Sequence, residues 1–239
     1  KNRLALILNF QRLEQQRKGY GYNYFQKNIN KDQILIYDVN KNKILKKFSL
    51  EKINPHLSND KYYFNHLSWS PNQKSFLAYI VKTNPRETNL YYFKNLLNYK
   101  KINIIDEISH HEWISSKKII FYGKIKNKKN FYIFNLSTKK YNKVRHDYTS
   151  LDGHLNSTDK KNFIVDTYPD RYHNRHLYNY NIIKEKIDKI GEIYSDLNFK
   201  YDNKCDLHPK YSLKQKYILL DTSHNGYRQM ILIKNKNES

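Results

Sequence analysis

The sequence predicts an all-β fold built from repeated units, and three observations support this. Short apolar runs rich in β-branched and aromatic residues, such as 76–80 and 163–165, alternate with polar turns. This arrangement recurs with a period near 44 residues, and a histidine stands at the same point of each recurrence. No window keeps an apolar period of 3.6 residues, so helices are not expected.

The repeated unit contains four short strands. The histidines that mark it are spaced by 44, 44 and 54 residues: His66, His110, His154 and His208. After each one come a polar turn and second strands at 76–80, 119–122, 163–165 and 217–220. Third strands follow at 90–93, 131–134, 177–180 and 230–233, and fourth strands at 140–144 and 186–190. Four antiparallel strands in about 44 residues are typical of a β-propeller blade.

The whole chain, 1–239, is predicted to form a single β-propeller domain. Segments 3–9, 34–37 and 44–48 supply the last three strands of a partial blade at 1–60. Further blades are expected near 61–106, 107–150, 151–200 and 201–239, so we expect a fragment of a larger ring. A β-sandwich is the rival fold, but it gives no reason for the same residue to recur in every unit.

The composition narrows the range of partners. The formal charge of +22 would suit nucleic acid, yet the lysines are scattered along the predicted turns, so nucleic-acid binding is not favoured. No stretch reaches 18 uncharged apolar residues, so no membrane-spanning segment is expected. The single cysteine, Cys205, excludes an internal disulfide and a cysteine-based zinc site. These features leave the cellular compartment undecided.

The four histidines of the repeat are predicted to meet. The first strand of a propeller blade is innermost, so equivalent positions of successive first strands point toward one axis at one height. Each histidine is expected to open its first strand, which would place all four at one mouth of the central channel. Neutral imidazoles bind divalent metals or protons. The alternative is that each histidine only bonds the backbone of the adjoining blade.

Loops that join second to third strands are expected at the same mouth, and they are rich in Arg, Asp and Tyr. Arginine pairs with carboxylates in a bidentate manner, and tyrosine offers a flat surface with a polar tip. The sequence therefore predicts a site for an acidic, hydroxyl-rich ligand. The residues expected to bind it are Arg12, Arg17, Tyr20, Tyr22, Arg86, Asp166, Asp170, Asp221 and Arg228, with Arg171 as a candidate catalytic cation.

Three strings carry a resemblance to a known group: Asn65-His66-Leu-Ser-Trp69-Ser-Pro71, Asp166-Thr-Tyr-Pro-Asp170-Arg171 and Cys205-Asp-Leu-His208-Pro. They resemble bacterial β-propeller proteins related to the oligogalacturonate lyase family and, more distantly, to TolB-type propellers. The resemblance covers most of the chain and is to the C-terminal part of such proteins. It implies a seven-bladed ring that acts on short uronate chains by β-elimination.

The resemblance also implies roles for the histidines. His66 would match the catalytic base and His110 a first ligand of a manganese or similar divalent ion, with His154 and His208 as further candidate ligands. The lyases draw several ligands from one close-spaced Gln/His cluster, whereas here His154 stands alone after Asp152-Gly153. Removing a proton beside a carboxylate needs a positioned base and a positive group near the developing charge, which Arg171, Arg228 or a metal would supply.

Two functions therefore remain open at the level of sequence. The first is a carbohydrate-active propeller, lyase or hydrolase, with an acidic oligo- or polysaccharide as substrate. The second is a non-catalytic propeller that binds a polysaccharide or a protein partner through the same face. Bound metal and formation of an unsaturated product would favour the first, whereas binding without turnover would favour the second.

Overall fold

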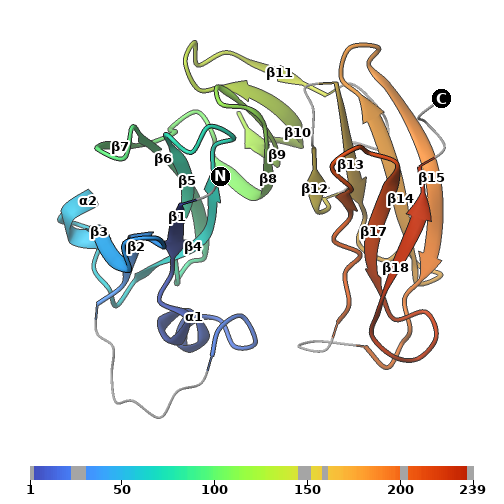
Figure 1. Ribbon diagram of the computed structural model, residues 1–239, viewed down its shortest axis with the longest axis horizontal. Coiled ribbons are helices and arrows are strands. Elements are labelled where there is room, and N and C mark those ends of the chain that lie inside the picture. Colours follow the sequence, from blue (N-terminus) through green and yellow to red (C-terminus); the bar gives the residue numbers. More distant parts are fainter. Residues whose placement is uncertain (1–2, 23–30, 145–151, 158–160, 200–203, 236–239) are drawn as a thin grey trace. The chain divides into compact units, whose positions relative to one another are not determined.

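The protein is described by a computed structural model that covers residues 3–22, 31–144, 152–157, 161–199 and 204–235 (Figure 1). The described residues form antiparallel sheets of three or four strands, which confirms the predicted all-β class and its four-stranded units. Contacts divide the chain into two compact units, Lys1–Glu107 and Ile108–Ser239. Each unit is described here by itself, and the single domain and its blade boundaries stay predictions.

The N-terminal unit contains two sheets. The first has the order β1 (Leu4–Ile7), β2 (Gln33–Asp38), β3 (Lys43–Ser49). The second has the order β4 (Tyr62–Trp69), β5 (Phe76–Lys82), β6 (Glu87–Lys94), β7 (Asn98–Lys101). The first sheet thus corresponds to the last three strands of a unit, as the sequence predicted.

The C-terminal unit contains three sheets. Strands β8 (Glu107–Ser115), β9 (Lys118–Ile125), β10 (Lys128–Asn135) and β11 (Tyr141–Lys143) form the first, in that spatial order. The second consists of β12 (Leu155–Asn156), β13 (Asn162–Asp166), β14 (Asn174–Asn181) and β15 (Lys186–Tyr194). The third consists of β16 (Lys210–Tyr211), β17 (Tyr217–Thr222) and β18 (Gln229–Lys234). Strands that are neighbours in sequence pair with each other throughout, as in a meander.

Successive sheets within each unit pack face to face through apolar side chains. In the N-terminal unit, Phe48 of β3 packs against Phe76 and Phe93, whose rings stack at 4.2 Å. In the C-terminal unit, one cluster joins Ile120 and Phe131 to Phe163, and a second joins Ile164 to Ile218. Every residue named here is buried. The β-branched and aromatic runs seen in the sequence are therefore the inward faces of the sheets.

The expectation of no helices was wrong at two places in the chain. A helix, α1 (Phe10–Gln16), begins after β1 because the side chain of Asn9 accepts the backbone N–H of Arg12 at 3.0 Å and caps the helix. It buries Gln11 and Leu13. A second short helix, α2 (Leu50–Ile53), is capped by Ser49. Helices of seven and four residues are too short to give a sustained 3.6-residue period.

The predicted position of the histidines within their strands also needs correction. β4 begins at Tyr62 and β8 at Glu107, so His66 and His110 lie inside their strands, whereas His154 and His208 precede β12 and β16. The pairing of β4 with β5 shifts between Asn65 and Ser68, and His66 sits in this bulge with a φ of 45°. His208, its counterpart in the repeat, has a φ of 41°.

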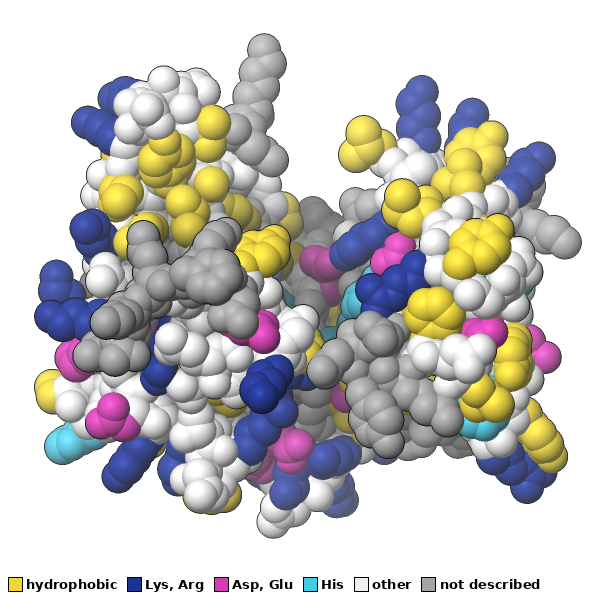
Figure 2. All heavy atoms as spheres, turned by 90° about the horizontal axis from the view of Figure 1, so that it is seen from below, with side chains coloured by type: hydrophobic (Ala, Val, Ile, Leu, Met, Phe, Trp, Pro, Cys, Tyr) yellow, Lys and Arg dark blue, Asp and Glu magenta, His cyan; other side chains and the backbone are white. Residues whose placement is uncertain are grey.

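On the face seen in Figure 2, Lys and Arg side chains are interspersed with acidic, apolar and neutral ones. This agrees with the scatter of lysines in the sequence. Among the described residues, no helix has the length and apolar character needed to cross a membrane.

Candidate metal centre

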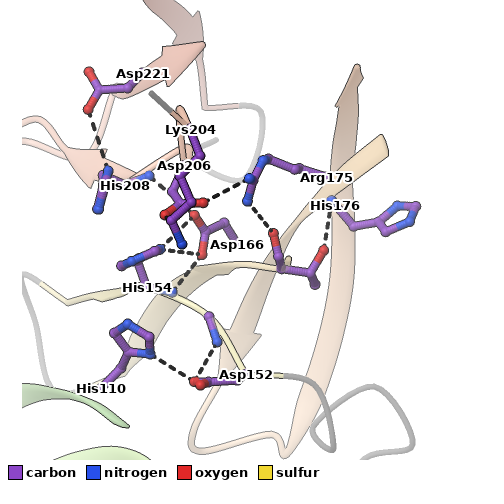
Figure 3. A network of polar contacts seen from close by, with 12 residues as sticks. His110, Asp152, His154, Asp166, Arg175, His176, Lys204, Asp206, His208 and Asp221 are labelled. Carbon is purple, nitrogen blue, oxygen red and sulfur yellow. Dashed lines mark hydrogen bonds and ion pairs between the residues drawn. The ribbon is translucent and has the colours of Figure 1, made fainter. Parts of the chain in front are cut away.

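Three of the four repeated histidines lie together in the C-terminal unit. His110 comes from β8, and His154 and His208 come from the residues just before β12 and β16. The ring of His154 lies between the other two, with centroid distances of 4.4 Å to His110 and 4.0 Å to His208 (Figure 3). His66 belongs to the N-terminal unit, where its ring stacks on Tyr79 at 4.9 Å.

The imidazoles of His110, His154 and His208 each direct Nδ1 at a carboxylate. His110 Nδ1 lies 2.8 Å from Asp152, and His154 Nδ1 lies 3.1 Å from Asp166 (Figure 3). His208 Nδ1 makes a longer approach of 3.7 Å to Asp221. A carboxylate that accepts Nδ1–H leaves the Nε2 lone pair as the available metal-binding atom.

The hydroxyl of Ser109 adds to the first of these pairs. Its Oγ donates to Asp152 at 2.7 Å and lies 3.2 Å from His110 Nδ1. Asp152 is thus held by two neighbouring residues of β8.

Asp206 is a member of the site that the sequence analysis did not identify. One ligand atom each of His154, Asp206 and His208 lies within 4.8 Å of the others. Asp206 is only 6% exposed and is held by Arg175 at 2.8 Å and Lys204 at 3.2 Å. Burial favours the neutral acid, but the positive charge of Arg175 and Lys204 outweighs it and lowers the pKa of the Asp206 carboxyl.

The imidazole of His208 is biased toward its neutral form. Partial burial, followed by the neighbouring His154 ring, lowers the pKa of His208 below its ordinary value, against the opposing effect of nearby carboxylates. Neutral imidazole is the form that coordinates a metal. Both shifts favour the forms that coordinate a metal, the ionised carboxylate of Asp206 and the neutral imidazole of His208.

The fit of these residues to a divalent ion follows from the donor types. Two imidazoles and one carboxylate suit manganese, iron or zinc, and such a set leaves further coordination positions for water or substrate. Carboxylates at the distal imidazole nitrogens are a recurrent feature of metal-binding histidines. The described residues thus fit the divalent cofactor that the resemblance implied, with Asp206 as an additional ligand.

The backbone at Gly153 lies very close to the backbone at Asp166. A Cβ added at Gly153 would lie 1.8 Å from the backbone oxygen of Asp166. Only glycine allows the segment before β12 to approach the end of β13 this closely. The contact brings Asp152 and His154, which flank Gly153, alongside Asp166.

A pocket of about 420 Å³ adjoins the cluster. Its lining includes Asp206 and His208 of the cluster, together with Lys204, Asp221 and Arg228. Arg228 is exposed, and its guanidinium donates to the backbone oxygen of Lys204 at 3.2 Å. Ionised cations next to candidate metal ligands suit a bound carboxylate.

Tyr168, which was not singled out from the sequence, flanks the same region. Its ring lies 6.5 Å from that of His154, and the ammonium of Lys204 lies 5.1 Å from its centroid. Its exposed ring offers an apolar surface beside the cations.

Two other residues proposed from the β13–β14 loop make local contacts. Asp170 accepts backbone N–H groups of Tyr172 and Asn174 and lies 2.9 Å from His176 Nε2. Arg171 is exposed, with its guanidinium 4.6 Å from the Tyr172 ring centroid. Asp170 therefore fixes the turn, and Arg171 does not line the pocket described above.

The remaining predicted binding residues lie in the N-terminal unit. Arg12 donates to the backbone oxygen of Asn59. Arg17 places its guanidinium 3.4 Å from the Tyr20 ring centroid, Tyr22 packs against Phe10, and Arg86 is exposed in the turn between β5 and β6.

A sequence signal for Asp206 existed. Asp152-Gly153-His154 and Asp206-Leu207-His208 share the pattern Asp-x-His at equivalent points of two successive repeats. In each case the aspartate faces the histidine of the preceding repeat: Asp152 lies against His110, and Asp206 is grouped with His154. Aligning the repeats on their histidines does not by itself reveal the aspartates, because Phe64 and Ile108 stand two residues before the histidine in the other two repeats.

No model of a known protein family matches the chain, and the search of curated proteins gave no significant match. Solved structures give the comparison. An oligogalacturonate lyase in complex with manganese superposes with a TM-score of 0.64 at 14% identity, covering 87% of this chain and 55% of the lyase. A putative TolB from Agrobacterium tumefaciens gives 0.57 at 17%, covering 87% and 67%.

A third similar structure is the β-propeller domain of the Trilobed protease from Pyrococcus furiosus. It gives a TM-score of 0.58 at 13% identity and covers 99% of this chain and 67% of that one. These similarities confirm the β-propeller fold, and the similar structures include a TolB-type propeller and an oligogalacturonate lyase, the groups that the sequence resembles. Since propellers of lyases, TolB and a protease all match, the fold by itself does not select an activity.

Proposed function

We propose that this chain carries a metal-assisted, lyase-like site for an acidic saccharide in its C-terminal unit. The observation that carries the proposal is the group His154, Asp206 and His208, two members of which line a pocket that also contains Arg228. A similar fold in a manganese-bound oligogalacturonate lyase supports it.

His154, Asp206 and His208 would hold a divalent ion, which supplies positive charge for a uronate carboxylate when bound. The exposed guanidinium of Arg228 lines the pocket. It would bind the same uronate carboxylate as the ion, or a neighbouring one. Lys204 is already paired with Asp206, so it neutralises that ligand rather than the substrate.

The reaction is a β-elimination. A base removes the proton from the carbon next to the carboxylate, the bond between the adjacent carbon and the glycosidic oxygen breaks, and a carbon–carbon double bond forms. The leaving oxygen takes up a proton from solvent and departs as a hydroxyl group. The resemblance assigns the base to His66. A second imidazole suited to the role is His110, whose Nδ1 is held by Asp152 so that Nε2 is the basic atom.

The test combines metal analysis with turnover. Purified protein is expected to retain manganese or zinc, and the variant His154→Ala to lose it. His56→Ala, at an exposed histidine outside the cluster, serves as the control. Incubation with oligogalacturonate should then raise the ultraviolet absorbance of an unsaturated product in a metal-dependent manner.

A flat absorbance trace over a panel of acidic saccharides would refute the lyase activity. If the same saccharides bound in a metal-dependent way without turnover, the chain would be a binding propeller that uses this face, with a polysaccharide as its partner. If neither metal nor saccharide bound, the proposed site would be abandoned and a protein partner would be the function to pursue.

A further inference from the structure

The carboxylate of Asp166 contacts both His154 and His208, two members of the candidate ligand group. Asp166 is the last residue of β13 and is completely buried. Its carboxylate accepts the backbone N–H of His154 at 2.5 Å and that of His208 at 3.2 Å. The Nδ1 of His154 lies 3.1 Å from the same group (Figure 3).

These contacts join two successive sheets. His154 belongs to the sheet of β13 itself, whereas His208 precedes β16 of the following sheet and lies 42 residues from Asp166 in the chain. One carboxylate therefore fixes the backbone of two candidate ligands that come from different sheets. A buried carboxylate is costly unless it is hydrogen-bonded, and here the residues around the proposed metal provide the donors.

The polarity of the contact with His154 has a chemical consequence. The Asp166 carboxylate already accepts two backbone N–H groups, and a carboxylate oxygen is an acceptor, so the contact favours the tautomer of His154 that carries its proton on Nδ1. The lone pair of this tautomer resides on Nε2. Asp166 thereby favours the tautomer that coordinates a metal through Nε2.

We propose that Asp166 is a positioning residue that sets the tautomer of His154 and aligns His154 with His208 across two sheets. The inference rests on the proposed metal-binding function and deepens it. Asp166 is not a member of the candidate ligand group, and its effect is exerted through both histidines.

The chain offers a matched comparison at Asp221. Asp166-Thr167 ends β13 and Asp221-Thr222 ends β17, so the two aspartates occupy equivalent points of successive repeats. The Asp221 side chain is 45% exposed and approaches His208 Nδ1 only to 3.7 Å. A positioning role assigned by geometry therefore belongs to Asp166 and not to its counterpart.

The substitution Asp166→Asn tests the inference because it keeps the shape and replaces one accepting oxygen with a donating N–H₂. In the Oδ2 position this N–H₂ donates to His154 Nδ1, drives the proton of the ring to Nε2, and removes the acceptor of the His208 backbone N–H. Manganese or zinc affinity, measured by titration calorimetry, is expected to fall by about 10- to 100-fold, the range for outer-sphere partners of metal-binding histidines. The control is Asp188→Asn, on β15 of the same sheet, where the carboxylate pairs with Lys186 away from the cluster. It is expected to leave the metal affinity near that of the wild type.

A second measurement keeps the test decisive if Asp166→Asn fails to fold. Long-range ¹⁵N–¹H correlation spectra of the metal-free wild-type protein report which ring nitrogen of His154 carries the proton. We expect the proton on Nδ1 in the wild type and on Nε2 in Asp166→Asn. A wild-type proton on Nε2, or equal losses of metal affinity in the two Asn variants, would overturn the role of Asp166.

The two proposals fail in different ways. If the wild type bound neither manganese nor zinc, the proposed function would fall, and the tautomer of His154 would still test whether Asp166 controls that ring. If the wild type bound metal and Asp166→Asn bound it equally well in a folded state, the positioning role would fall and the metal site would stand.

Discussion

Replacing Asp32 with asparagine tests how the N-terminal unit tolerates a buried carboxyl group. Asp32 is 2% exposed and precedes β2. Its side chain accepts the backbone N–H of Phe64 at 2.6 Å. Burial raises the pKa of the Asp32 carboxyl from 3.8 to about 7, and this effect outweighs the opposing ones of the Phe64 N–H and of Arg12.

The sign and size of the effect on stability follow from this pKa. The folded protein holds the Asp32 proton more tightly than the unfolded chain, so the group stabilises the fold below about pH 4. This contribution is lost as the pH rises through about 7. At about 1.4 kcal/mol for each pH unit, the difference between 3.8 and about 7 corresponds to about 4 kcal/mol, of which about 3 kcal/mol is lost between pH 5 and 8.

Asp32→Asn is neutral at every pH and still offers an oxygen to Phe64. Its free energy of unfolding should therefore exceed that of the wild type at pH 8 and come close to it near pH 4. Urea unfolding followed by circular dichroism at several pH values measures the difference. Asp60→Asn, at an exposed carboxylate in the same unit, is the control and should leave the pH dependence unchanged.

The reasoning would be refuted by the opposite slope. If the ion pairing with Arg12 dominated, Asp32 would be ionised in the folded state, and Asp32→Asn would be less stable than the wild type at pH 8. The same conclusion would follow if the variant and the wild type lost equal stability between pH 5 and 8.

Three further predictions concern the C-terminal unit and the base. Gly153→Ala should destabilise the fold by about 1–3 kcal/mol, because the added Cβ meets the Asp166 backbone oxygen at 1.8 Å; thermal unfolding measures the loss, and an unchanged melting temperature would contradict the close approach. Arg228→Gln should weaken the binding of galacturonate but not of galactose, whereas Arg171→Gln, outside the pocket, should change neither; calorimetry with both sugars decides. His110→Gln should abolish product formation while bound metal is retained, as expected of a base outside the group His154, Asp206 and His208; undiminished turnover would exclude His110 as the base.

The fold was predictable from the sequence because each blade repeats its own local signals. The polar turn after each histidine and the apolar run that follows it recur in every unit, and β5, β9, β13 and β17 lie where those runs were found. The starts of the first strands were less predictable. β8, for example, begins upstream of His110. The residues there form a strand because they pair with β9, and such pairing depends on residues elsewhere in the chain rather than on the local sequence.

The candidate site was predictable only in part, for a physical reason. A residue shared by all repeats, the histidine, is visible by alignment of the chain with itself. Asp206 is visible only when the contact between one repeat and the next is known. The roles of the aspartates could not be derived from residue type either: Asp166 is buried among N–H donors and Asp170 caps a turn, although both were expected to bind a ligand.

The residue two positions before each repeated histidine changes from apolar to acidic along the chain. Phe64 and Ile108 hold this position in the first two repeats and are buried in their sheets, as an ordinary inward-facing position requires. In the next two repeats the same position holds Asp152 and Asp206. A carboxylate where related repeats bury an apolar side chain costs stability unless its charge is compensated.

The compensation differs at the two aspartates, and this difference assigns them different tasks. Asp152 accepts from Ser109 and the backbone N–H of Gly153 and lies against His110, so its task is to orient one imidazole. Asp206 is compensated by the cations Arg175 and Lys204, which keep it ionised while His154 and His208 remain within reach. A carboxylate kept charged in a buried position by two cations, and left beside two imidazoles, is arranged for a further positive partner. Of the two, Asp206 is therefore the one expected to coordinate the metal.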